Sequence, residues 1–222
     1  MELAVTSVCA DRVRDGTADL GIIPVVEMRR QELDFLRGTG IACDGAVRSI
    51  LLISKVPFGR IRTLAADTSS RTSVVLSQVV LEQRYGVRPA VTPHRPDLDA
   101  MLETADAALI IGDPALHLEP AGLPLAWLDL GAEWKQMTGL PFVFAVWAGR
   151  PEYLSQPWER LFLDSLEYGL ERVDEIVARE SVRRNVPASL AKCYLTRYIQ
   201  FRLGDRHYSG MERFLEYARP YL

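Results

Sequence analysis

The feature that most constrains the fold is a short, continuous apolar run that recurs between segments of helical character. Residues 107–111, Ala-Ala-Leu-Ile-Ile, form one such run, and it ends in Gly112-Asp113. A run of this length without polar alternation predicts a strand covered on both faces. Strands of this kind alternating with helices indicate an α/β protein with a parallel sheet between helical layers.

Several further elements follow from periodicity and from the residues that end helices. A helix over 7–15 should end at Gly16 and another over 74–85 at Gly86, because glycine adopts the left-handed conformation that closes a helix. Other expected strands are 19–24, 46–56, 63–66, 87–92, 125–128 and 141–147, with helices at about 97–103 and 132–137. From Ser155 onward the pattern is helical only, so we expect an α/β body with a helical C-terminal tail.

Composition and charge exclude several classes of protein. The 222 residues include 26 Lys and Arg and 29 Asp and Glu, so no strong basic field exists and neither nucleic acid nor a membrane is an expected partner. No apolar run reaches the roughly 18 residues of a membrane span, and Asp11 and Arg12 interrupt any signal peptide. Cys9, Cys43 and Cys193 lack metal-ligand spacing. The sequence predicts a cytoplasmic protein that needs no metal or organic cofactor.

The densest polar segment lies between an expected strand and an expected helix. Residues 67–73, Asp-Thr-Ser-Ser-Arg-Thr-Ser, hold five hydroxyl groups. A helix N-terminus attracts an anion through its N–H groups and dipole, and Arg71 would add a fork for a carboxylate. The simpler alternative is a well-capped helix, although capping needs only one or two hydroxyls. The expected ligand-binding residues here are Ser69, Ser70, Arg71 and Thr72.

Two more polar residues are candidates because of their place beside apolar runs. Asp113 follows the run at 107–111, and the carboxyl ends of parallel strands form the usual ligand crevice. Asp113 could equally cap the next helical turn. Ser49 lies within the expected strand 46–56, where a buried hydroxyl needs a partner, either backbone or ligand, and backbone is the simpler choice. No catalytic or metal-site spacing is shared by His94, His117 and His207.

Six strings in this sequence resemble successive motifs of the MqnA family, the chorismate dehydratases of the futalosine route to menaquinone. They occupy residues 45–49, 54–57, 67–73, 107–116, 129–134 and 138–147. The resemblance runs from about residue 18 to residue 147, with a weaker helical match to the C-terminus. Each string alone is weak evidence, whereas the order and spacing of all six are specific.

The resemblance implies a two-lobed fold similar to type II periplasmic binding proteins, with the ligand in the cleft between the lobes. Strands around 47–54 and 142–148 would be the crossovers, so that lobe one comprises 1–48 and 149–222 and lobe two comprises 49–148. Family members convert chorismate to 3-[(1-carboxyvinyl)oxy]benzoate and water without redox chemistry. The two carboxylates of chorismate suit the polar residues around Ser49, residues 69–72 and Asp113.

A sister family bears on which reaction the resemblance implies. Its members are naphthoate synthases, and they carry a catalytic histidine followed by glutamate where this chain has Gly112-Asp113. The absence of a histidine at this position favours the dehydratase. The alternatives are a non-catalytic binding protein for a small dicarboxylate and, with least support, an interaction protein that uses the helical tail.

The N-terminus departs from the family pattern. Members usually begin with an additional strand and helix, including a Tyr-Leu-Asn-like loop that lines the cleft. In this sequence residues 1–6 already resemble the segment before the second β-α unit, so the family's cleft loop is missing before Met1. We therefore leave the catalytic residues unassigned and expect weak binding and little turnover.

Overall fold

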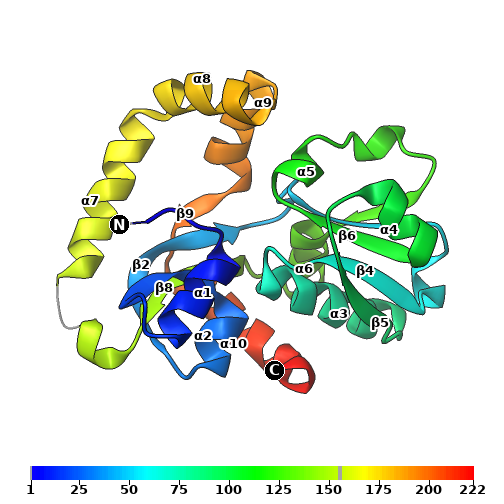
Figure 1. Ribbon diagram of the computed structural model, residues 1–222, viewed down its shortest axis with the longest axis horizontal. Helices are drawn as coiled ribbons and strands as arrows, with labels where there is room; N and C mark the ends of the chain where they lie inside the picture. The colour runs from blue at the N-terminus through cyan, green and yellow to red at the C-terminus, as the bar shows by residue number, and fades with distance from the viewer. Residues whose placement is uncertain (1, 155–156) are drawn as a thin grey trace.

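The computed structural model describes residues 2–154 and 157–222, and the strands of this part form two sheets that lie side by side (Figure 1). The four-stranded sheet has the order β1 (Leu20–Pro24), β8 (Phe142–Gly149), β2 (Asp34–Cys43) and β9 (Gln200–Arg202). The five-stranded sheet has the order β5 (Ala90–His94), β4 (Thr63–Asp67), β6 (Ala107–Ile111), β3 (Ile50–Ser54) and β7 (Ala126–Asp129).

Helices cover both sheets and form an arch beside the first. The helices of the body are α1 (Thr6–Arg14), α2 (Val25–Arg30), α3 (Arg71–Tyr85), α4 (Leu98–Thr104), α5 (Asp113–Leu116), α6 (Leu130–Thr138) and α10 (Asp205–Ala218). The helical arch consists of α7 (Trp158–Glu171), α8 (Val173–Arg184), α9 (Ala188–Cys193) and the π-helical turn Tyr194–Tyr198. Figure 1 shows the arch leaving the four-stranded sheet after β8 and returning to it at β9.

The continuous apolar runs predicted burial correctly but not strand direction. All five residues of β6 are buried, as expected for a strand covered on both faces. The parallel sheet predicted from these runs is only partly present, because β4 runs parallel to β5 and β6, whereas β3 runs antiparallel to β6 and β7. The pairs of the four-stranded sheet are antiparallel. The pattern of apolar side chains along a strand indicates whether the strand is buried. The direction of the strand depends on how the chain connects it to its neighbours, which this pattern does not encode.

The sequence predicted the helix ends that glycine marks. It did not predict some of the strands that pair with segments far away in the sequence. Gly16 and Gly86 follow α1 and α3 with φ of 72° and 69°, as the sequence indicated. The structure adds α2, β2 and β9, which the sequence analysis did not identify.

The predicted helix start at Ser155 lies outside the described residues. The first described helix, α1, begins at Thr6 and packs against β1, so the predicted helix over 7–15 is confirmed within one residue at each end.

The first crossing between the sheets, residues 44–49, is a bend rather than the start of the predicted strand 46–56. Gly45 and Arg48 have φ of 121° and 67°, which breaks the extended backbone before β3. The buried Asp129 carboxylate accepts hydrogen bonds from the N–H groups of Val47 at 3.0 Å and Arg48 at 2.6 Å. The same carboxylate caps α6 by accepting from the N–H of Ala132 at 3.0 Å. One side chain therefore fixes both the crossing and the helix beside it.

The second crossing, residues 139–141, leads into β8. This strand pairs with β1 and β2, although the sequence placed residues 142–148 in lobe two. We therefore propose that lobe two, the five-stranded sheet with its helices, ends at about residue 141, and that β8 belongs to lobe one with the four-stranded sheet.

Helix α10 packs closely against the second crossing. The Gly210 backbone approaches the Pro141 carbonyl so closely that a β-carbon at position 210 would lie 2.0 Å from that oxygen. The same carbonyl accepts a hydrogen bond of 3.1 Å from the Trp134 indole nitrogen. Phe214 of α10 is fully buried and meets the Trp134 ring edge-to-face at 6.0 Å. The helical C-terminal part of the chain predicted from the sequence is present, and its helix α10 is part of the core.

We predict that Gly210→Ala destabilises the protein because α10 must move away from Pro141 to admit the methyl group. The expected loss in the free energy of unfolding is about 1–3 kcal/mol. The matched control is Gly169→Ala in α7, where an added β-carbon meets nothing within 4 Å. There the free energy of unfolding should rise by about 0.5–1 kcal/mol, the helix propensity of alanine over glycine. Urea titration of both variants measures the difference, and equal stabilities would contradict the packing described.

Candidate functional site

The polar residues singled out in the sequence come together at one edge of the five-stranded sheet. Strands β4 and β6 are parallel, so their carboxyl ends meet at this edge. Strand β3 runs in the opposite direction, with Ile50 opposite Ile111, and therefore begins there. The carbonyl of Ser49 accepts a hydrogen bond of 2.8 Å from the N–H of Gly112. Ser49, residues 69–70 and Asp113 form what we call the polar edge.

Ser49 is buried and its hydroxyl bonds to a residue far away in the sequence. Its exposed fraction is 3%, and its Oγ lies 3.0 Å from the Oη of Tyr194, with either atom able to donate. The sequence analysis expected a backbone partner, and that expectation was wrong. Tyr194 opens the π-helical turn at the end of the helical arch. Burial raises the pKa of the Tyr194 phenol, so this hydroxyl stays protonated at neutral pH.

The loop before α3 keeps its hydroxyls partly exposed. The Ser69 N–H donates to the Asp67 carboxylate at 2.9 Å, and the Ser70 Oγ lies 2.9 Å from the Ser73 Oγ. Ser70 is the N-cap residue of α3, yet its side chain makes no capping hydrogen bond. The Ser70 hydroxyl therefore bonds within the first turn of its own helix, as the simpler alternative predicted, but to the Ser73 side chain and not to a backbone N–H. Ser69 and Ser70 lie partly exposed at the start of a 15-residue helix, where an anion is favoured.

Arg71 and Thr72, which were predicted from the sequence to contact the ligand, face lobe one and contact its residues. The Arg71 guanidinium donates two hydrogen bonds of 2.9 Å to Asp11 of α1 and lies 3.3 Å from Glu27 of α2. The Thr72 hydroxyl is fully buried and accepts from the Val26 N–H at 3.4 Å. The carboxylates of Asp11 and Glu27 thus contact the Arg71 guanidinium, which the sequence analysis had assigned to a ligand carboxylate. Both residues hold α3 against lobe one.

Asp113 is the first residue of α5 and pairs with the helical arch. Its carboxylate lies 2.6 Å from the Arg184 guanidinium at the end of α8. The hydrogen bond that Arg184 donates to the Asp113 carboxylate is the main reason why the pKa of Arg184 is raised. The neighbouring His117 Nε2 lies 2.9 Å from the Arg184 carbonyl oxygen, which accepts a hydrogen bond from the tautomer that carries its proton on Nε2. Asp113 therefore joins lobe two to the arch instead of capping its own helix.

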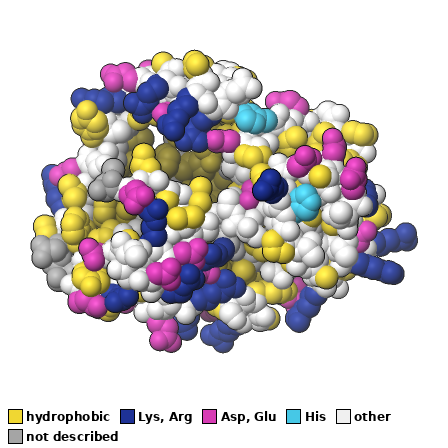
Figure 2. Space-filling model, in the orientation of Figure 1, with side chains coloured by type: hydrophobic (Ala, Val, Ile, Leu, Met, Phe, Trp, Pro, Cys, Tyr) yellow, Lys and Arg dark blue, Asp and Glu magenta, His cyan; other side chains and the backbone are white. Residues whose placement is uncertain are grey.

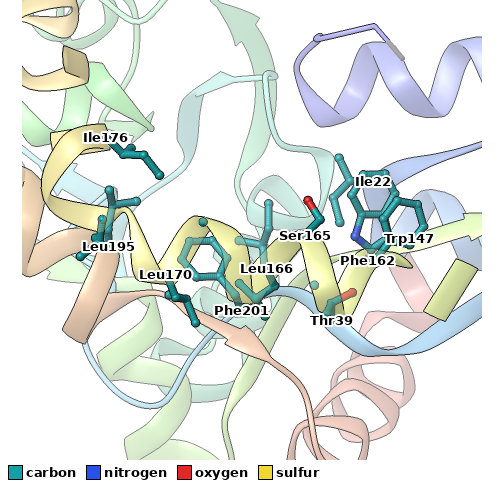
Figure 3. A pocket seen from close by; sticks show the side chains of 14 residues that line it. Ile22, Thr39, Trp147, Phe162, Ser165, Leu166, Leu170, Ile176, Leu195 and Phe201 are labelled. Atoms are coloured by element: carbon teal, nitrogen blue, oxygen red, sulfur yellow. The ribbon is translucent and has the colours of Figure 1, made fainter. Parts of the chain in front are cut away.

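An apolar hollow opens under the arch, beside the polar edge. Figure 2 shows it lined by hydrophobic side chains, and its volume is about 360 Å³. Ile22 and Ile41 line it from the four-stranded sheet, and Leu195 lines it from the π-helical turn. Trp147 stacks on Phe162 of α7 with ring centroids 3.9 Å apart, as Figure 3 shows. Sequence analysis missed this hollow because distant segments supply its walls.

Three further observations concern the described part of the chain. Within residues 2–154 and 157–222, no three His, Cys, Asp or Glu side chains are placed to hold a metal ion. The same residues contain no helix that is long and apolar enough to cross a membrane. Burial raises the pKa of the Cys43 thiol, which keeps it protonated and unreactive at neutral pH.

Comparison with known proteins identifies relatives over most of the chain. A family model described as menaquinone biosynthesis matches residues 2–220. A chorismate dehydratase of Thermus thermophilus is 30% identical over 206 residues, which cover 84% of this chain and 74% of that protein. A chorismate dehydratase of Campylobacter jejuni is 32% identical over 127 residues, covering 57% of this chain and 43% of the relative.

Solved structures share the fold at low sequence identity. A protein from Archaeoglobus fulgidus superposes with a TM-score of 0.76 at 18% identity, over 99% of this chain and 84% of that one. The periplasmic aliphatic sulphonate binding protein of Escherichia coli gives 0.62 at 13% identity, over 100% and 80%. These likenesses confirm the predicted periplasmic-binding-protein-like fold. Because the family model spans residues 2–220, the chain belongs to the menaquinone biosynthesis family, as its resemblance to MqnA sequences indicated.

Proposed function

We propose that this chain binds chorismate between its lobes and dehydrates it to 3-[(1-carboxyvinyl)oxy]benzoate. The observation that carries the proposal is the match to the menaquinone biosynthesis family over residues 2–220, supported by 30% identity to the Thermus thermophilus chorismate dehydratase. The finer placement belongs to the same proposal: a carbon–oxygen hydro-lyase of the futalosine route that acts in the cytoplasm.

The polar edge supports binding of a dicarboxylate through hydroxyl and N–H donors. Ser49, Ser69 and Ser70 lie together there, and the N-terminus of α3 adds the favourable end of a helix dipole. The cations near this edge already have carboxylate partners: Arg48 lies by Glu119, Arg71 by Asp11 and Arg184 by Asp113. We propose that the three serines and the first turn of α3 hold one substrate carboxylate, with the Asp113–Arg184 pair at the border of the site.

The reaction makes modest demands on the protein. Chorismate loses its ring hydroxyl and one ring proton, which leave together as one molecule of water, and the ring becomes aromatic. Aromatisation supplies the driving force, so the protein must hold the substrate in one orientation and assist proton movement. The proposal requires no redox cofactor and no metal ion. The group that accepts the ring proton stays unassigned.

We predict that Ser49→Ala and Ser70→Ala weaken chorismate binding because each removes a donor to the carboxylate. Affinity should fall about 2- to 10-fold for each variant, the value of one hydrogen bond. Titration calorimetry gives the affinity, and chromatography of the reaction mixture gives the 3-[(1-carboxyvinyl)oxy]benzoate formed. Ser209→Ala on the exposed face of α10 serves as the matched control and should leave both unchanged.

The same experiment separates the two candidate functions. Product formation supports the dehydratase. Chorismate binding at the polar edge without product would instead support the non-catalytic binding protein. Unchanged affinity in both serine variants would contradict the assignment of the site.

The proposed site also depends on the ion pair that holds α3 against lobe one. The hydrogen bond from Arg71 is the main reason why the pKa of Asp11 is lowered. An Asp pKa that is lower in the folded protein adds stability above about pH 4, its unfolded value, and this stability is lost as the pH falls further. We therefore predict that Arg71→Gln reduces the free energy of unfolding at pH 7 by about 1 kcal/mol, a value limited by solvent screening.

The difference between wild type and Arg71→Gln should shrink as the pH falls from 7 to 3, because the stability that comes from the lowered pKa of Asp11 is lost progressively below about pH 4. Urea unfolding at the two pH values measures it. Arg213→Gln, which removes an exposed pair with Glu216, is the control and should change stability by less than about 0.5 kcal/mol at either pH. A difference that stays constant with pH would show that Asp11 is not the partner that matters.

A further inference from the structure

We propose that Tyr194 is a positioning residue for Ser49, and that its hydroxyl orients the Ser49 hydroxyl toward the substrate carboxylate when the helical arch lies against lobe two. The inference rests on the proposed function, because Ser49 is there a proposed substrate contact. It assigns to the arch a role in substrate binding.

The backbone of Ser49 is held independently of its side chain. The hydrogen bond from Gly112 to the Ser49 carbonyl and the pairing of β3 with β6 fix the main chain. The hydroxyl can still rotate among its staggered positions. In the described structure its recorded hydrogen-bond partner is the Tyr194 hydroxyl at 3.0 Å. Tyr194 therefore selects one orientation of the side chain that we place against the substrate.

The local conformation at Tyr194 is unusual and specific. The Ile199 N–H donates to the Tyr194 carbonyl at 3.0 Å, five residues apart, which is the hydrogen bond of a π-helix. Such turns are rare and are frequent at functional sites. This turn directs Tyr194 to Ser49 while the next residue, Leu195, lines the apolar hollow, where Figure 3 shows it. The π-helical turn thus contacts the polar edge through Tyr194 and the apolar hollow through Leu195.

Two more contacts tie the arch to lobe two at the same place. Arg184 at the end of α8 pairs with Asp113, and its carbonyl lies 2.9 Å from the His117 ring. The arch residues are 67 to 145 positions away from their partners in the sequence. These contacts form only when the arch and α5 are close together. The orientation of Ser49 is therefore coupled to the position of the arch.

Either hydroxyl can donate in the Ser49–Tyr194 hydrogen bond, and the positioning role uses the direction in which the phenol donates to Ser49. Burial keeps the phenol protonated, so it can donate to the Ser49 oxygen. The Ser49 proton is then free to point away from Tyr194. A hydroxyl whose oxygen already accepts one hydrogen bond is a better donor to a carboxylate, because chains of hydrogen bonds polarise one another.

The test is Tyr194→Phe, which keeps the ring and removes the hydroxyl. Chorismate affinity by calorimetry should fall about 2- to 10-fold. In the double variant with Ser49→Ala the two losses should not add, because Tyr194 acts through Ser49. Where turnover is measured, KM should rise and kcat should change little, because the contact is made in both the ground state and the transition state. Tyr198→Phe in the same turn is the control and should match wild type.

A second measurement does not depend on substrate. In protein labelled at the tyrosine ζ-carbon, the Tyr194 resonance should shift in Ser49→Ala and stay in place in Ser209→Ala. A merely structural hydroxyl would lower stability in Tyr194→Phe without changing affinity.

The outcomes separate this inference from the function on which it rests. If wild type binds chorismate and the Tyr194 and Ser49 losses add fully, the positioning role is overturned and the proposed function stands. If wild type binds no chorismate, both are overturned.

Discussion

The arrangement of this protein depends on a single buried carboxylate, that of Asp129. It accepts hydrogen bonds from two successive N–H groups of the first crossing, at Val47 and Arg48, and also caps α6. Arg48 is held with φ of 67°, and its guanidinium donates to the carbonyls of Ala115 and Leu118 around α5. The residue that follows is Ser49. The position of the proposed substrate contact is thus set by the hydrogen bonds that join the lobes.

Elements whose conformation depends on neighbouring residues in the sequence could be predicted. Elements that form only by pairing with distant segments could not. The apolar run of β6 and the glycines after α1 and α3 act through their own conformation and burial. Strand β9 has three residues inside a helical segment, and it is a strand only because β2 lies beside it. The lobe boundary that we propose at about residue 141 differs from the one predicted from the sequence for the same reason, since the partners of β8 are β1 and β2.

The site shows the same division. Ser49, Ser69, Ser70 and Asp113 were predicted from the sequence as ligand contacts, and the structure shows that they lie at one sheet edge, because the strand ends they flank meet there. That they bind a ligand stays a prediction. Their partners could not be found in this way. Tyr194 lies 145 residues from Ser49, and Arg71 meets carboxylates from α1 and α2. Sequence pattern located the polar groups, whereas the packing of the lobes decided which of them stay available to a ligand.

The central claim is that the polar edge, and not the apolar hollow, receives the substrate. A crystal structure with 3-[(1-carboxyvinyl)oxy]benzoate bound tests it most directly. The account predicts a ligand carboxylate within hydrogen-bond distance, about 2.5–3.0 Å, of the hydroxyls of Ser49 and Ser70. A ligand seated between Trp147 and Leu195 under the arch, without contact to either serine, would contradict it.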